Sequence, residues 1–107
     1  MQNERLATLK KLEFTDKEDV TIKYFLALEY KKMEDLTCER YFDILFKDFP
    51  EYLPPYYISG EYYYEKEEYQ KSFQILTKGL VVAKEQKNQK AIAEIQNLLM
   101  NVEFELE

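Results

Sequence analysis

A chain of 107 residues that is 46% hydrophobic and 34% charged is too apolar to stay disordered and too charged to span a membrane. Its formal net charge of −6 repels phosphate backbones, so nucleic acid is excluded as an expected partner, and its longest apolar run is far shorter than the roughly 20 residues that cross a bilayer. Two glycines and three prolines leave few turns, which favours an all-α fold over many short strands.

The N-terminal segment is predicted to form a short helix. Leu6, Leu9 and Leu12 recur at every third position and indicate a helix over residues 3–12. Thr15 and Glu18 then have the spacing of a capping box, in which each side chain bonds to the backbone amide of the other. The next helix is therefore expected to begin at this point.

Two helical hairpins are predicted to follow, over residues 16–50 and 51–86. In the first, helical spacing continues to about Lys32, and the second helix must end before Pro50, because proline disfavours helical geometry at the preceding residue. In the second, two prolines at 54–55 suit a helix start.

A closing helix is predicted over residues 88–106, after a polar break that follows the second hairpin. The whole chain, residues 1–107, is expected to form a single domain.

The two hairpins share one pattern of small and aromatic residues. Tyr30 and Tyr63 are 33 positions apart (63 − 30), and the small residues Cys38 and Ser72 are 34 apart (72 − 38). A small residue also precedes each tyrosine by three positions, namely Ala27 and Gly60. Self-similarity at this period is typical of a repeat protein.

This pattern resembles the tetratricopeptide repeat, a helix-turn-helix unit of 34 residues. The matching residues of the second hairpin are Tyr56, Gly60, Tyr63, Tyr69, Ser72 and Gly79, and those of the first are Leu26, Ala27, Tyr30, Cys38, Phe42 and Pro50. Lys23 departs from the pattern, because it stands where the repeat has its leading aromatic residue. Two antiparallel helices approach closely only where a side chain is small, and aromatic rings fill the space around that crossing.

The resemblance implies an all-α fold in which antiparallel helical hairpins stack as a short right-handed solenoid with N-terminal and C-terminal capping helices. A solenoid generally needs three or more repeats, so these terminal helices must cover the exposed ends. An ordinary bundle of five or six helices with an accidental repeat is the alternative.

The residue types present exclude most catalytic and metal sites. Without histidine the chain lacks the usual general base and the commonest metal ligand, and its one cysteine, Cys38, can form neither a thiolate metal site nor an internal disulfide. Glu65, Glu67 and Glu68 are the remaining carboxylate cluster, on a predicted turn where charges are normally solvated. We expect no enzyme, no cofactor and no metal, and, with no signal-peptide pattern at the start, a cytoplasmic location.

In tetratricopeptide-repeat proteins the first helix of each hairpin lines a concave groove, and the resemblance implies that the faces not used for packing lie there. In this chain these faces carry Tyr24, Leu28, Lys31, Tyr57, Glu61 and Tyr64. Tyrosine combines a large apolar area with a polar tip and is enriched at binding hot spots. We therefore expect an adaptor that binds an unidentified peptide or protein in a tyrosine-lined groove. Alanine at Tyr57 or Tyr64 should then weaken binding and leave thermal stability nearly unchanged.

The closing helix provides an alternative function. Beside the apolar row that caps the stack, it carries a second row formed by Ile92, Leu99 and Leu106, and the two rows together are wider than one neighbouring helix needs. This second row suggests a structural or assembly protein that homodimerises or docks on a larger complex through its C-terminal helix.

Overall fold

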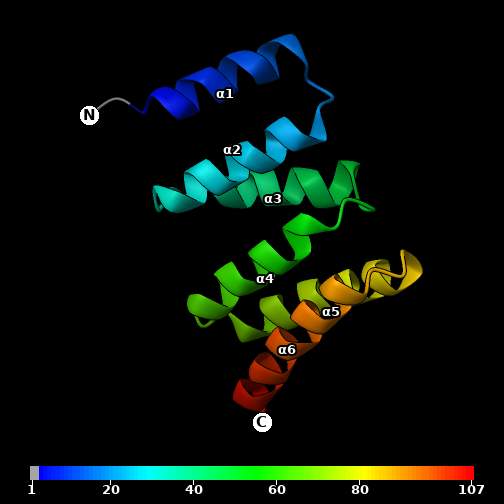
Figure 1. Cartoon of the computed structure of the whole chain (residues 1–107). Helices are drawn as coiled ribbons and strands as arrows, with labels where there is room; N and C mark the ends of the chain where they lie inside the picture. Colours follow the sequence, from blue (N-terminus) through cyan, green and yellow to red (C-terminus); the bar gives the residue numbers. More distant parts are fainter. Residues whose placement is uncertain (1–2) are drawn as a thin grey trace. The chain divides into compact units, whose positions relative to one another are not determined.

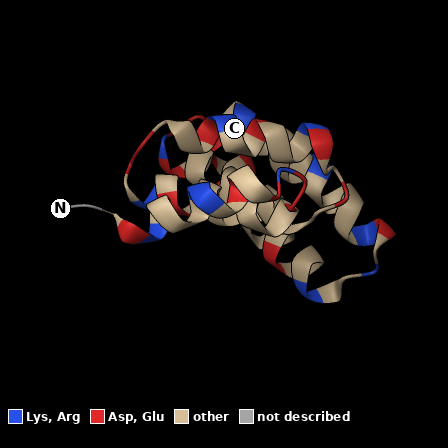
Figure 2. Ribbon diagram, turned by 90° about the horizontal axis from the view of Figure 1, so that it is seen from above, with Lys and Arg blue, Asp and Glu red and all other residues tan. Residues whose placement is uncertain are grey.

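The computed structural model describes residues 3–107, and these residues form six α-helices and no β-strand (Figure 1). The helices are α1 Glu4–Thr15, α2 Val20–Lys32, α3 Thr37–Asp48, α4 Pro54–Glu65, α5 Tyr69–Glu85 and α6 Gln89–Leu106. They gather into two compact units, unit 1 ending at Tyr52 and unit 2 spanning Leu53–Glu107. Acidic and basic residues are interleaved along the helices (Figure 2). The predicted all-helical fold is confirmed.

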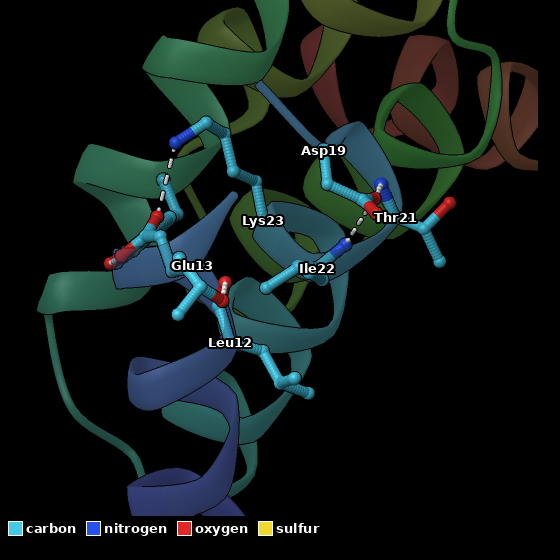
Figure 3. A network of polar contacts seen from close by, with 8 residues as sticks. Leu12, Glu13, Asp19, Thr21, Ile22 and Lys23 are labelled. Atoms are coloured by element: carbon cyan, nitrogen blue, oxygen red, sulfur yellow. Dashed lines mark hydrogen bonds and ion pairs between the residues drawn. The ribbon is translucent and has the colours of Figure 1, made fainter. Parts of the chain in front are cut away.

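Helix α1 is longer than predicted, and the expected capping box at Thr15 and Glu18 is wrong. Thr15 is the last residue of α1, and its hydroxyl donates to backbone carbonyls of the same helix. The cap of α2 is Asp19, whose Oδ1 accepts the amide protons of Thr21 at 2.9 Å and Ile22 at 3.2 Å (Figure 3). Aspartate is a better cap than threonine, and its negative charge suits a helix N-terminus.

Unit 1 is a hairpin of α2 and α3 with α1 packed on α2. Its core contains the fully buried residues Leu26, Ala27, Phe42 and Leu45, and Cys38 is only 1% exposed, as its predicted packing position requires. The start of α1 is fixed to α2 by the buried carboxylate of Glu29, which accepts from Asn3 Nδ2 at 2.9 Å and pairs with Arg5 Nε at 3.2 Å.

Unit 2 is a hairpin of α4 and α5 closed by α6, which packs on both. Its two glycines lie where α4 and α5 are in close contact. A Cβ atom on Gly60 would lie 2.5 Å from Leu76 Cγ, and one on Gly79 would lie 2.5 Å from Tyr56 Cβ. Carbon atoms that are not bonded to each other do not approach so closely, so only glycine fits. The small residues that the repeat pattern requires at this crossing are therefore confirmed.

Three turns between helices share one backbone geometry. Glu34, Glu67 and Lys87 have positive φ angles of 58°, 63° and 56° just after α2, α4 and α5. In each turn the next amide donates to the carbonyl five positions earlier at 2.9–3.0 Å, which is a Schellman motif. The two hairpin turns are 33 residues apart (67 − 34), so the repeat extends to the backbone of the turns.

Candidate functional site

Three of the predicted binding residues lie on one face of α2 in unit 1. Tyr24, Leu28 and Lys31 are all half-buried. The Tyr24 ring meets Tyr52 edge to face, with ring centroids 5.8 Å apart and an interplanar angle of 76°. Burial raises the pKa of Tyr24, and the nearby Tyr52 raises this pKa further. The Tyr24 ring is thus held by a neighbour while part of it stays accessible.

The other three predicted residues, Tyr57, Glu61 and Tyr64, lie on one face of α4 in unit 2 and are also half-buried. Tyr57 and Tyr64 pack against the core that α5 and α6 provide. Burial first, and then the carboxylates of Glu61 and Glu94, raise the pKa of Tyr57. Alanine at either tyrosine would remove core packing as well as ring surface, contrary to the expectation that thermal stability would stay nearly unchanged.

The predicted self-association residues of α6 do not form one exposed stripe. Leu99 is 7% exposed and belongs to the core of unit 2, Ile92 packs against that core, and only Leu106 is substantially exposed, at 41%. The expectation is wrong for Leu99 because α6 packs on both α4 and α5 and therefore uses a wide apolar surface inside its own unit. The most exposed large apolar residues of α6 are Met100 at 68% and Phe104 at 73%, one turn apart on the face opposite the core.

Glu13 is the centre of a polar network that the sequence pattern did not predict. Its Oε2 pairs with Lys23 Nζ at 3.1 Å, and its Oε1 accepts from the Tyr41 hydroxyl at 2.8 Å, so one carboxylate joins α1, α2 and α3 (Figure 3 shows the Lys23 contact). Burial and then the bond to Glu13 raise the pKa of Tyr41 to about 12. Lys23, which departs from the repeat pattern, therefore has a structural role. The partners are 10 and 28 positions from Glu13, too far apart for a local signal.

The remaining chemical candidates of the sequence form no compact site. Glu65, Glu67 and Glu68 are all exposed around the α4–α5 turn. Within residues 3–107, no group of three His, Cys, Asp or Glu side chains is placed to hold a metal ion. No helix in this described part of the chain combines the length and the apolar character needed to cross a membrane.

The chain is similar to solved structures of tetratricopeptide repeat domain proteins. One is the crystal structure of a tetratricopeptide repeat domain protein from Salinibacter ruber, with a TM-score of 0.74 and 27% identity, covering 79% of this chain and 97% of that chain. Another is the solution NMR structure of a tetratricopeptide repeat domain protein from Salinibacter ruber, with a TM-score of 0.77 and 28% identity, covering 82% of this chain and 90% of that chain. No protein-family model and no curated protein matches the sequence.

Proposed function

We propose that this chain, which is a tetratricopeptide-repeat protein, is a non-enzymatic interaction module that binds a peptide or protein segment. The repeat fold of its structural neighbours supports this role, because helical-repeat proteins act through extended binding surfaces. The contacts that we propose are made by Tyr24, Leu28 and Lys31 of α2 and by Tyr57, Glu61 and Tyr64 of α4.

The observation that carries this proposal is the state of the Tyr24 ring. Tyr52 holds it edge to face, and it is still partly accessible. A ring that is already fixed loses little conformational freedom when a partner covers it, so more of the buried area contributes to affinity. Leu28 and Lys31 extend the same face with an apolar and a positively charged group.

The test changes this face without truncating a tyrosine. Leu28→Asp combined with Lys31→Glu is compared with Thr77→Asp combined with Lys78→Glu, which makes the same change in charge on exposed positions of α5. Partners are captured from the source cells with the parent chain, and their affinity for all three proteins is measured by calorimetry after circular dichroism has verified folding. We expect the α2 variant to bind at least about tenfold more weakly and the α5 variant to bind normally. Equal affinities for the two variants would refute the proposed surface.

A second candidate function is self-association through α6, and the observation that favours it is the pair of exposed side chains Met100 and Phe104. Two large apolar groups one turn apart provide a compact apolar surface that a second copy could cover. Light scattering at high micromolar concentration should then give a dimer for the parent chain and a monomer for Phe104→Glu. A parent chain that is monomeric throughout contradicts this function.

A further inference from the structure

Unit 1 contains a cleft of about 380 Å³ that sequence reasoning did not predict. Helix α1 contributes Lys10 and Phe14, the α1–α2 connection contributes Lys17, and α3 contributes Arg40. Lys23 of α2 also lines the cleft. The volume is at the lower end of the range for ligand pockets, which suits a few side chains of a peptide and not a folded domain.

The cleft is positively charged although the chain is acidic. Four cationic side chains and one carboxylate, Glu13, line it, which gives a local charge of +3 (4 − 1) in a chain of net charge −6. Glu13 is already engaged, because Lys23 and the Tyr41 hydroxyl contact its two oxygens. No carboxylate of the cleft lining is therefore left to balance the charges of Lys10, Lys17 and Arg40.

The other three cations lie over aromatic rings. Lys10 Nζ lies 5.9 Å from the Tyr30 centroid, Lys17 Nζ 6.0 Å from that of Phe14, and Arg40 Cζ 5.7 Å from that of Tyr41. A ring face attracts a cation but does not neutralise it, so these groups still favour an anion. Lys10 is also close enough to Asp35, outside the cleft, to help lower the pKa of that carboxyl, after the backbone and side-chain hydrogen bonds of Thr37. Lys17 and Arg40 are therefore the strongest anion-binding candidates.

An exposed apolar surface adjoins these charges. Phe14 is 79% exposed at the wall of the cleft, and Ile44 of α3 is half-buried beside it. An isolated inorganic anion has no use for such a surface, whereas a peptide can contact cations and a ring together.

We propose that this cleft binds an acidic peptide segment of a partner protein, with carboxylates contacting Lys17 and Arg40 and a neighbouring apolar side chain covering Phe14. Nucleic acid fits less well, because the rest of the chain, with a net charge of −9 (−6 − 3), repels a phosphate backbone that extends beyond the cleft. The proposal uses unit 1 alone and does not depend on the tyrosine-bearing faces of α2 and α4.

The test is fluorescence anisotropy with a labelled peptide that has four glutamates around one phenylalanine, beside a matched peptide with glutamines. Lys17→Glu combined with Arg40→Glu is compared with Lys78→Glu combined with Lys84→Glu, an equal charge change on exposed positions of α5. The four positions changed in these two variants are all exposed, so circular dichroism should give unchanged melting for both variants. Phe14→Ala tests the apolar contact.

We expect the acidic peptide to bind at about 0.1 M salt, where the Debye length is about 10 Å, and the glutamine peptide not to bind. The cleft variant should bind about tenfold more weakly or worse and the α5 variant within about twofold of the parent chain, because nearby charges dominate over distant screened ones. Equal binding of the two peptides, or an equal loss in the two variants, would overturn the site. Displacement of the peptide by millimolar inorganic phosphate, or tighter binding of an oligonucleotide or of phosphatidylserine vesicles at the same residues, would overturn the choice of an acidic peptide.

Discussion

Alanine at Gly60 is expected to destabilise the protein, although alanine normally stabilises a helix interior relative to glycine by about 0.5–1 kcal/mol. The new Cβ would lie 2.5 Å from Cγ of Leu76, which is fully buried. Extra carbon atoms in a packed core cost about 1–3 kcal/mol, and an overlap this deep belongs in the upper half of that range. After the helix-propensity gain of about 0.5–1 kcal/mol is subtracted from about 2–3 kcal/mol, the net loss is about 1–2.5 kcal/mol.

The matched control is Gly60→Ala in a Leu76→Ala background, where the substitution should stabilise the protein instead of destabilising it. Leu76→Ala removes the atoms that would clash and leaves a cavity beside Gly60, at a cost of about 2–5 kcal/mol. In this background Gly60→Ala should stabilise the protein by about 0.5–1 kcal/mol, so the two changes are coupled by the overlap cost of about 2–3 kcal/mol. Urea unfolding followed by far-ultraviolet circular dichroism gives all four free energies. The same sign in both backgrounds would refute the close approach of α4 and α5 at this residue.

Three further predictions concern unit 1 and the turns. Tyr41 should ionise near pH 12 in a spectrophotometric titration. Because this folded pKa exceeds the ordinary value of 10.0, the free energy of unfolding should fall as the pH rises from about 10 to about 12. The fall should be smaller in Tyr41→Phe, which has no hydroxyl to ionise. Asp19→Ala should lower the free energy of unfolding by about 1 kcal/mol and Thr15→Ala by less than about 0.5 kcal/mol, whereas equal losses would contradict Asp19 as the cap. Glu67→Gly should raise the melting temperature, since a left-handed residue other than glycine costs about 1 kcal/mol; a lower value would contradict this turn.

The hairpins could be predicted from the sequence because their signals are local. Pro50 fixes the end of α3 to within two residues, and Asn88 both ends the polar break and caps α6 by accepting from Ala91 N at 3.0 Å. The start of α2 could not be predicted in the same way, because Thr15 and Asp19 are both suitable caps only four residues apart. The longer α1 carries Glu13 to its partners on α2 and α3, and such a tertiary contact has no counterpart in a local pattern.

The binding and assembly surfaces were harder to predict, because periodicity gives the face of a helix but not the number of its neighbours. If α6 packed on one helix, the apolar row that contains Leu99 would not be needed for packing. Leu99 is buried because α6 packs on two helices, α4 and α5. The same limit applies to Tyr57 and Tyr64, whose spacing suggested free groove positions and whose rings also pack on the core of unit 2.

The basic cleft shows why net charge is a poor guide to the partner of this protein. Lys10, Lys17, Lys23 and Arg40 are spread over 31 residues among acidic neighbours, so the sequence presents no basic stripe. Only the packing of α1, α2 and α3 brings them to one cleft, where Glu13 is already occupied. Screening limits the influence of exposed charges to about 10 Å at 0.1 M salt, so a ligand at the cleft responds to its +3 more than to the distant acidic residues. An acidic chain can therefore attract an acidic partner at one place and repel it elsewhere, which favours a short segment over an extended polyanion.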